Sequence, residues 1–330
     1  MEIQKRLVSI VVPLFNSERF IADTIQSCLD QSCKNWELIV IDDNSSDGSL
    51  AIVESFTKNN DNIKLYSNTT EKKGANTCRN IGIKKAKGEY ILFLDSDDLL
   101  HINCIKRRIA YSETKSGLDF YIFTIGSFYK VVGDCNYLWN SFSGNHLEKF
   151  LLHELPWHTS SPLWNKQFLL DAGGFNESFQ RLQDVELHTR ILLQNPSYEI
   201  CNENSPDVFY RIDEHRISGD YIEFVKKWKK GAIDYISLFL LLIKEKKYKK
   251  SLKGTFFEIL KQINTAYISK KISRKNYKKL VKGFFRELNQ VDENIFRSFF
   301  LIKLYNYLFV LGLYKIKGFN YLFKKIYIYY

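Results

Sequence analysis

The 330-residue chain lacks several patterns that would assign it to familiar classes of protein. The loop after its first apolar run, Pro13–Ser17, contains no glycine, which argues against an oxidoreductase with a Gly-x-Gly-x-x-Gly turn at that point. The six cysteines form no Cys-x-x-Cys pair and have no zinc-like spacing with histidine, so we expect reduced thiols in a cytosolic protein. No uninterrupted apolar run reaches 18 residues, so no conventional membrane span is expected.

Acidic residues are scarce in the last third of the chain. Residues 221–330 hold 25 Lys and Arg against 7 Asp and Glu, a net charge of +18. The remaining 23 basic and 30 acidic residues give residues 1–220 a net charge of −7. A basic tail favours contact with a polyanion, either a membrane or a nucleic acid. The abundance of Lys, Asn, Ile, Tyr and Phe also fits compositional drift, so both interpretations stay open.

Apolar runs alternate with helical patterns in the first part of the chain. The runs predict strands and the 3.6-residue periodicity or capping residues predict helices: strands at 7–12, 37–41, 63–66 and 90–94, and helices at 18–31, 46–56 and 75–86. This alternation predicts an α/β fold with a mainly parallel central sheet and helices on both faces. The first run is interpreted as a strand rather than a signal peptide, because it is short and Asn16-Ser17-Glu18 follows it.

The segments that follow are less regular. Residues 119–132 look strand-like, 133–165 look irregular, and 184–194 predict a helix. Beyond Tyr221 the pattern is almost wholly helical, basic and aromatic, so we expect a domain boundary near residue 220.

Two loops at predicted strand ends are strongly acidic, Asp42-Asp43-Asn44-Ser45 and Asp95-Ser96-Asp97-Asp98. Ligands bind beyond the carboxyl ends of strands in open α/β sheets. Acidic clusters on neighbouring strand ends repel unless something cationic or hydrogen-bonding lies between them. Asp-x-Asp after a hydrophobic strand also offers the hard oxygen ligands that Mg²⁺ or Mn²⁺ prefers. The alternative is that Asp97 or Asp98 caps a helix starting near His101, but capping needs one acid rather than three, so we favour a metal.

The order of several segments is more specific than any one of them. VSIVVPLFN, ELIVIDDNSSDGS and RNIGIKKAKGEYILFLDSDD follow one another, and GGFNESFQRLQDVELHTRIL comes later. Together they resemble family 2 glycosyltransferases over about residues 6–215. The resemblance implies a GT-A fold, Rossmann-like, with a C-terminal helical extension. The implied organisation is a catalytic domain at 1–220, made of a nucleotide-sugar-binding half at 6–115 and an acceptor half at 116–220, and a basic, aromatic helical region at 221–330.

The resemblance also implies roles for residues that would hold the donor. Pro13 and Phe15 would line the base pocket, with Asn16 beside them. Asp43 would accept a hydrogen bond from the ring N–H of a uracil-type base, which favours a UDP-sugar. Asp42 would support Asp43 or face the ribose.

The diphosphate and the metal would lie near four further residues. Arg79 would sit near the base or the diphosphate, although a surface helix charge is an equal alternative. Its neighbour Cys78 stands where the family usually has alanine. Asp95 and Ser96 would approach the ribose or the sugar. Asp97 would be the direct ligand of Mn²⁺ or Mg²⁺, with Asp95 as a second metal candidate.

Asp184 is the predicted catalytic base, by resemblance to the acceptor motif of the family. The usual Glu-Asp pair reads Gln183-Asp184 here, so the first acid is missing and the second is present. A position at the start of an amphipathic helix favours the ionised carboxylate that a base needs, although Asp184 could also be only the helix cap. Glu186 is the alternative base. The expected reaction is a single displacement that inverts the anomeric carbon, with an oxocarbenium-like transition state.

Four further residues are weaker candidates. Trp157 and Trp164 could stack on a sugar or could be core aromatics. Arg211 and His215 lie in a polar stretch that, by the resemblance, could close over the diphosphate.

The basic tail suggests partners. Residues 296–330 mix aromatic runs with lysines, as in helices that lie in the interface of anionic membranes. We therefore expect a cytoplasmic enzyme, peripheral at the inner face of the membrane, that acts on a saccharide or lipid-linked acceptor in lipopolysaccharide, capsule or exopolysaccharide synthesis. A homodimer or simple packing on the enzyme is the alternative for these helices.

Two other classes of function compete with this interpretation. A sugar-phosphate nucleotidyltransferase would normally show a Gly/Arg/Lys-rich loop after the first strand, which is absent. A nucleic-acid-binding protein would leave the acidic strand ends unexplained, so no nucleic-acid partner is expected. The family's processive synthases carry Gln-x-x-Arg-Trp and several spans, and neither occurs here, so we expect transfer of one sugar.

Overall fold

The computed structural model describes residues 6–201, 203, 205–213, 220–291 and 299–329. The chain divides into two compact units. Unit 1 comprises residues 1–143, 156–178 and 190–214, and unit 2 comprises residues 144–155, 179–189 and 215–330. The last segment of unit 2 begins at residue 215, and two earlier segments of the chain also belong to that unit.

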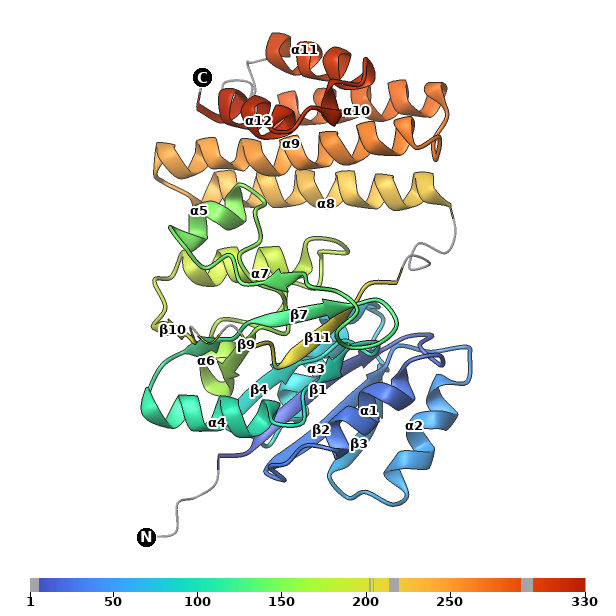
Figure 1. Cartoon of the computed structure of the whole chain (residues 1–330), viewed down its shortest axis with the longest axis vertical. Coiled ribbons are helices and arrows are strands. Elements are labelled where there is room, and N and C mark those ends of the chain that lie inside the picture. Colours follow the sequence, from blue (N-terminus) through green and yellow to red (C-terminus); the bar gives the residue numbers. More distant parts are fainter. Residues whose placement is uncertain (1–5, 202, 204, 214–219, 292–298, 330) are drawn as a thin grey trace. The chain divides into compact units, whose positions relative to one another are not determined.

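Unit 1 is built on a seven-stranded sheet with the order β10-β6-β9-β4-β1-β2-β3 (Figure 1). The strands are β1 (Val8–Leu14), β2 (Trp36–Asp42), β3 (Ile63–Ser67), β4 (Tyr90–Phe93), β6 (Phe120–Ile122), β9 (Pro162–Asn165) and β10 (Tyr198–Ile200). Within each pair the strands run parallel, except that β9 is antiparallel to both β4 and β6. The sheet is therefore mainly parallel, as the sequence predicts.

Helices cover both faces of this sheet, because successive side chains of a strand point to opposite faces. Ile10 and Val12 of β1 share a core cluster with Ile21 of α1 (Ile21–Leu29) and Val53 of α2 (Ser49–Thr57). Val11 points the other way, towards α3 (Ala75–Lys85), where a Cβ on Gly82 would lie 2.3 Å from its Cγ1. The missing side chain of Gly82 thus lets α3 pack closely on the sheet.

Pro13 lies near the end of β1, beyond the last residue of β1 that pairs with β4. Its lack of an N–H therefore costs no hydrogen bond between these two strands. The β1–β4 pairing stops at Val11, whose carbonyl still accepts from the Leu94 N–H at 3.1 Å. Proline is tolerated where a strand makes no ladder bond on that side. The carboxyl end of β1 is therefore open towards β4.

A second, four-stranded sheet in unit 1 has the order β5-β11-β7-β8. Its strands are β5 (Leu99–Leu100), β11 (Val208–Arg211), β7 (Ile125–Phe128) and β8 (Leu138–Trp139), and α4 (Cys104–Thr114) and α6 (Lys166–Asp171) complete the unit. The strand-like segment 119–132 therefore divides between two sheets. The expectation of an irregular segment at 133–165 was wrong, because it contains β8, β9 and the short helix α5 (His146–Leu151).

Unit 2 is helical. It contains α5, most of α7 (Gln183–Leu192), and then α8 (Tyr221–Leu242), α9 (Lys246–Ile268), α10 (Arg274–Val291), α11 (Phe299–Val310), the 3₁₀ turn η1 (Leu313–Lys315) and α12 (Phe319–Tyr329). Figure 1 shows α8 and α9 side by side.

Close packing explains why two earlier segments belong to this unit. A Cβ on Gly254 of α9 would lie 2.5 Å from Cα of Leu152, just after α5. The Thr255 hydroxyl donates to the Leu151 carbonyl at 3.0 Å. The hydroxyls of Thr189 and Tyr235 lie 2.7 Å apart, which joins α7 to α8. The α5 segment and the start of α7 therefore belong to the helical core.

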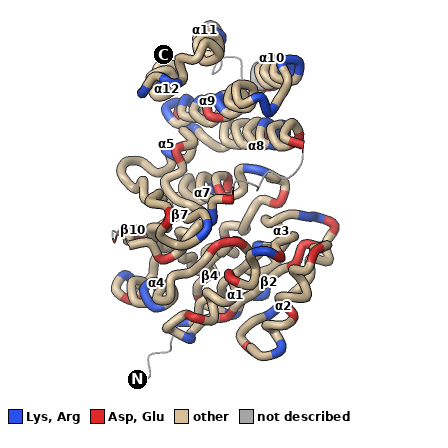
Figure 2. Tube along the Cα trace, turned by 45° about the vertical axis from the view of Figure 1, so that its right-hand side comes forward, with Lys and Arg blue, Asp and Glu red and all other residues tan. Residues whose placement is uncertain are grey.

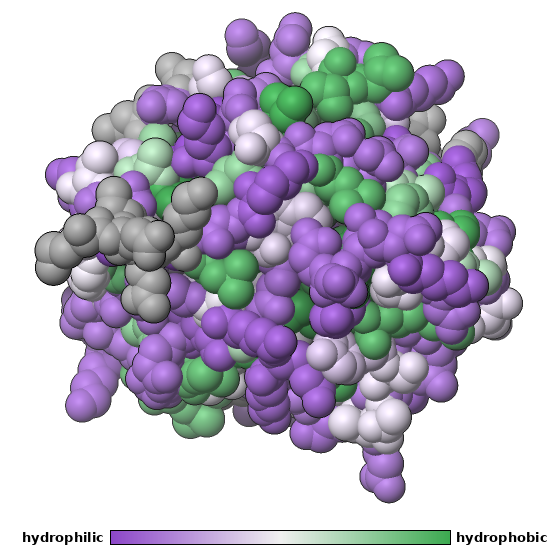
Figure 3. Space-filling view, turned by 90° about the horizontal axis from the view of Figure 1, so that it is seen from below, coloured by the Kyte–Doolittle hydropathy of each residue, from purple (hydrophilic) through white to green (hydrophobic). Residues whose placement is uncertain are grey.

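The described surface differs between segments of the chain. Lys and Arg outnumber Asp and Glu along α8 to α12 (Figure 2). The face seen in Figure 3 is mostly hydrophilic, with hydrophobic side chains scattered among polar ones. Within the described ranges, every helix is too short or too polar to cross a bilayer. All six cysteines are free thiols, as expected, and four of them are buried.

Candidate active site

Hydrogen bonds tie together three loops at the carboxyl edge of the central sheet. The Asn16 side chain after β1 accepts from the Ser46 N–H after β2 at 2.8 Å. The Ser17 and Ser96 hydroxyls lie 2.7 Å apart and join the loops after β1 and β4. We expected the two acidic loops to follow neighbouring strands. They do not, because β1 lies between β2 and β4 in the sheet. The β1 loop is therefore the bridge between the two acidic loops.

The two carboxylates after β2 have different structural surroundings. Asp42 is buried and accepts from the backbone N–H groups of Asn44 and Ser45, so it shapes its own turn. Asp43 accepts from the Asn68 side chain and from the Gly74 N–H, both at 2.7 Å. Gly74 has φ of 110°, a conformation that favours glycine. Asp43 thus fixes the start of α3 against the β2 loop, while its carboxylate has capacity for further bonds.

Arg79 is buried rather than a surface charge. Its side chain is 6% exposed, and its guanidinium donates to the Asp95 carboxylate at 2.7 Å. The same guanidinium lies 5.1 Å from the centre of the Phe175 ring. Burial raises the pKa of the adjacent Cys78 thiol to about 12, and the nearby Asp43 carboxylate adds to the effect. Cys78 is therefore a protonated, inert neighbour of the site.

Arg211, at the end of β11, forms hydrogen bonds to the acidic loop after β4. The Arg211 N–H donates to the Asp98 carboxylate at 2.9 Å, and its side chain donates to the Asp97 carbonyl at 2.8 Å. The guanidinium also lies 4.4 Å from the ring centre of Phe128. Arg211 therefore supports the backbone of the loop.

Asp97 and Asp98 do not cap the following helix. That helix, α4, begins at Cys104 with Asn103 before it. Asp98 is fully buried and Asp97 is 9% exposed. The helix-capping alternative for these acids is therefore wrong.

An exposed aromatic ring lies in the loop after β1. Phe15 follows β1 and is 58% exposed, although most large apolar side chains of unit 1 are buried. The next residue, Asn16, has φ of 48°, which asparagine tolerates better than most residues. The β1 loop therefore presents a ring to solvent beside the linked polar loops.

The carboxylate oxygens of the loop after β4 are of the kind that bind a divalent cation together with phosphate oxygens of a ligand. In the described residues, no three His, Cys, Asp or Glu side chains come together as a metal cluster. Asp95 and Asp97 supply hard carboxylate oxygens within one short loop. Mg²⁺ is commonly held by one or two carboxylates, with phosphate oxygens and waters at its other positions.

Comparison with known proteins assigns part of the chain to a family. The model of the family described as Glycosyl transferase family 2 matches residues 9–164. Residues 9–164 of the chain therefore form a domain of glycosyltransferase family 2. An uncharacterized glycosyltransferase of Haemophilus influenzae is 40% identical over 105 residues, which are 32% of this chain and 42% of that protein.

Other relatives match more of the chain. The GalNAc(5)-diNAcBac-PP-undecaprenol beta-1,3-glucosyltransferase of Campylobacter jejuni is 31% identical over 52% of this chain and 55% of its own length. The chain thus spans about half, or less, of the curated relatives described here. The crystal structure of S. aureus TarS 1-349 with UDP-GlcNAc has a TM-score of 0.64 and 19% identity, covering 97% of this chain and 91% of that one. That likeness concerns the fold, which is of GT-A type.

The predicted base, Asp184, lies in unit 2. Asp184 occupies the first turn of α7. The helix begins one residue earlier, at Gln183, so Asp184 is within the helix. Glu186, the alternative base, is fully buried. Burial lowers the pKa of the nearby His153 to about 4, against the opposite influence of the Glu258 and Asp184 carboxylates.

Two weaker candidates are corrected by their burial, and one lies outside the described residues. Trp157 is 1% exposed and Trp164 is 0% exposed. Trp164 packs 4.6 Å from the Phe120 ring within the sheet. Both rings are therefore part of the protein core, and the interpretation that they stack on a sugar is wrong. His215 falls outside the described residues.

Sequence reasoning missed the residues that anchor α3 to the loop after α6. The Asn80 side chain donates to the Phe175 carbonyl at 2.9 Å and accepts from the Phe175 N–H at 2.8 Å. Gly174 beside it has φ of 62°, and a Cβ there would lie 2.6 Å from the Asn80 oxygen. A cavity of about 480 Å³ is lined by this loop and α3. The signal was present in Arg79-Asn80 and in Gly173-Gly174-Phe175, but the sequence does not show that these segments meet.

A buried ion pair was also missed. The Arg108 guanidinium binds Asp207 through two bonds of 2.9 and 2.7 Å and donates to the Ser160 carbonyl at 3.0 Å. Burial lowers the pKa of Arg108, but the Asp207 carboxylate and smaller contributions from neighbouring groups together outweigh burial, so the pKa is raised. Arg108 belongs to α4, so the pair ties this helix to the segment before β11. The Asp207 carbonyl also accepts from the His101 N–H, just before the helix.

Proposed function

We propose that the chain transfers one sugar from a nucleotide diphosphate sugar, with a UDP-sugar favoured, to a hydroxyl group of a saccharide or lipid-linked acceptor. The observation that carries this proposal is the set of three strand-end loops joined by Asn16 and Ser17 within a family 2 domain, with Asp43 fixing the start of α3 beside them. Membership of that family favours a glycosyltransferase over the nucleotidyltransferase alternative.

The donor would bind along this edge. Phe15 and Pro13 would contact the base, with its ring N–H donating to Asp43. Asp42 would keep the turn in shape, and Arg79 would hold Asp95 in place beside the sugar. Asp97 and Asp95 would hold Mn²⁺ or Mg²⁺, which would neutralise charge on the diphosphate.

The transfer itself would be one displacement. The Asp184 carboxylate takes the proton of the acceptor hydroxyl as the oxygen bonds to the anomeric carbon. The bond between that carbon and the diphosphate oxygen breaks, and the electron pair leaves with the nucleotide. Attack from the side opposite the nucleotide inverts the anomeric centre. General base catalysis of this kind contributes on the order of 10²–10⁴-fold to the rate.

The experiment for this proposal starts with a panel of nucleotide sugars, ranked by thermal shift with and without Mn²⁺. The preferred donor is then given to the wild-type chain and to Asp184→Asn with hydroxyl acceptors, and nucleotide release and product length are measured. We expect the substitution to lower transfer by about 10²–10⁴-fold while nucleotide affinity stays unchanged. The product should be one sugar longer.

Two variants serve as controls for the base. Asp171→Asn removes an exposed carboxylate from the end of α6 and should leave transfer unchanged. Glu186→Gln tests the alternative base. Full activity of Asp184→Asn, with loss of activity in a folded Glu186→Gln, would reject Asp184.

We further propose that α11, η1 and α12 contact an anionic membrane surface that carries the acceptor. Large apolar side chains there are exposed: Tyr307 at 64%, Leu311 at 59%, Ile316 at 61% and Tyr321 at 68%. The basic excess of residues 221–330 complements an anionic bilayer. Exposed apolar rings beside lysines are typical of interfacial helices.

Partition onto vesicles tests this surface. Replacing Tyr307, Leu311 and Tyr321 by serine should reduce binding to phosphatidylglycerol vesicles at least tenfold, because three of the most exposed apolar side chains of this surface are removed. The side chains are exposed, so folding should be retained. A control triple variant, Lys246→Ser with Lys250→Ser and Lys270→Ser, removes exposed charge elsewhere on unit 2. Unchanged partition of the apolar variant would reject membrane contact through these helices.

A further inference from the structure

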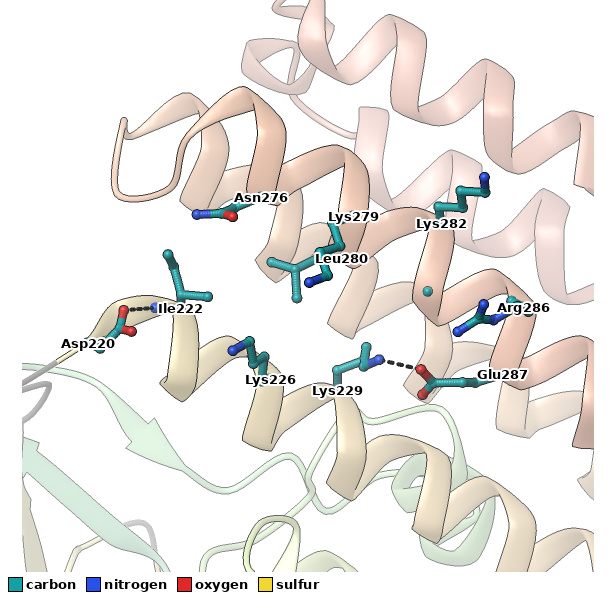
Figure 4. Close-up of a pocket in the computed structure, with 11 residues that line it drawn as sticks. Asp220, Ile222, Lys226, Lys229, Asn276, Lys279, Leu280, Lys282, Arg286 and Glu287 are labelled. Carbon is teal, nitrogen blue, oxygen red and sulfur yellow. Dashed lines mark hydrogen bonds and ion pairs between the residues drawn. The ribbon is translucent and has the colours of Figure 1, made fainter.

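A cavity of about 560 Å³ lies between α8 and α10 within unit 2 (Figure 4). Five cationic side chains line it: Lys226, Lys229, Lys279, Lys282 and Arg286. Figure 4 shows Lys226 and Lys229 on α8 and Lys279 and Arg286 on α10 directed into the space between the helices, whereas Lys282 points away from it. This volume is in the range of pockets that hold small ligands.

The acids that line the cavity do not balance these charges. Glu287 is occupied by Lys229, whose ammonium lies 2.7 Å from its carboxylate. Asp220 accepts from the Ile222 N–H at 2.8 Å and so caps α8. Among the described residues, no carboxylate forms an ion pair with Lys279, Lys282 or Arg286. Cations held together in this way repel one another, and a multiply charged anion relieves the repulsion.

Gly283 lines the cavity, and its lack of a side chain leaves space there. A Cβ on that residue would lie 3.7 Å from the Lys229 Nζ and 3.8 Å from the Glu287 Oε1, so even a small side chain would occupy this space. Arg286 offers a planar fork of N–H donors that matches phosphate oxygens, and the lysines add point charges. Asn276 adds an amide at the rim.

We propose that this groove between α8 and α10 binds linked phosphate groups, as in a pyrophosphate or a phosphodiester chain. A single small anion would meet few of the cations at once, because they extend along both helices. Linked phosphates can meet Lys279 and Arg286 of α10 together, whereas Lys226 of α8 already pairs with Glu223. The groove belongs to unit 2, whereas the residues proposed to hold the donor belong to unit 1. Only the further idea that its ligand is the phosphate-bearing part of an acceptor rests on the proposed function.

Calorimetric titration of the full chain with inorganic pyrophosphate tests the groove. EDTA is present throughout, so that a metal-dependent donor site does not contribute. We expect binding that weakens as salt is raised, because screening reduces the attraction. The double variant Lys279→Gln with Arg286→Gln should bind at least tenfold more weakly.

Two comparisons make this result specific. Lys246→Gln with Lys250→Gln removes the same charge from exposed positions of α9 and should change affinity less than twofold. Gly283→Leu fills this space in the cavity without a change of charge, is favourable for a helix, and should also weaken binding at least tenfold. Equal losses in the groove and control variants, or unchanged binding in Gly283→Leu, would overturn the proposal.

A parallel experiment with vesicles distinguishes free linked phosphates from lipid headgroups as the ligand. Phosphatidylglycerol vesicles present single phosphodiester headgroups on a surface. Binding to vesicles without binding to free pyrophosphate would overturn the groove proposal in favour of general attraction to a bilayer. Asp97→Asn should lose metal-dependent UDP binding and keep pyrophosphate binding in EDTA, so failure of the proposed function and failure of the groove give different results.

Discussion

The two units of the molecule use charge in opposite ways. In unit 1 the carboxylates at the strand ends meet fixed donors, as Asp43 meets Asn68 and Gly74. In unit 2 the cations are spread along helix faces, and those of α10 in the groove have no carboxylate partner among the described residues. Strands that end at one edge concentrate polar groups at one place, whereas helices distribute them over their length. The first arrangement builds a shaped site, and the second leaves a surface that attracts anions.

The sharpest way to break this comparison is to remove a buried charge from unit 1. Arg108→Met leaves Asp207 buried without its partner, and we expect a loss of about 3–5 kcal/mol in the free energy of unfolding. Arg107→Met is the matched control on the same helix, because Arg107 pairs with the exposed Glu203. That change should cost less than about 1 kcal/mol. Urea unfolding of both variants measures the difference.

Equal stabilities of the two variants would contradict the account of unit 1. They would mean that the pair between Arg108 and Asp207 does not hold α4 against the segment before β11. The double variant Arg108→Met with Asp207→Leu removes both charges and should recover part of the loss, since no unpaired charge then stays buried.

A smaller effect is expected from pH in unit 2. Burial holds the pKa of His153 near 4, while an unfolded histidine titrates near its usual value of about 6.5. Between these values the unfolded chain binds the additional proton, so stability is complete above about pH 6.5 and falls as pH decreases towards 4. The loss from this one group should be roughly 2 kcal/mol at pH 5.

His153→Asn tests that origin. Asparagine tolerates the φ of 58° at this position and does not titrate. Urea midpoints at pH 7 and pH 5 should differ less in the variant than in the wild type. The same decrease in both would assign the acid sensitivity to other groups.

The sequence predicted the parts of the fold that depend on local pattern. β1, β2 and β4 were visible as apolar runs and α1 as a periodic segment, because each of these patterns is local in the sequence. β9 was missed, because it is four residues long, begins with Pro162, and pairs with β4 and β6, which lie far from it in the chain.

The candidate site was predictable to the level of its loops but not of its contacts. Asp42, Asp43 and the Asp95 loop were found from their positions after strands. The partners that hold them were not, since Gly74 and Arg211 reach these loops only through tertiary packing. Trp157 and Trp164 were ambiguous for the same reason, because the sequence does not distinguish an aromatic ring on a ligand from one in a core.

The most direct measurement of the central claim is the affinity of the full chain for UDP in Mn²⁺ and in EDTA, compared among the wild type, Asp43→Asn, Asp97→Asn and the exposed control Asp61→Asn. The account predicts that EDTA weakens wild-type binding at least tenfold, that Asp97→Asn removes this dependence, that Asp43→Asn weakens binding in both conditions, and that Asp61→Asn behaves as the wild type. Equal UDP affinity in all four proteins would contradict a nucleotide-sugar site at the linked loops of unit 1.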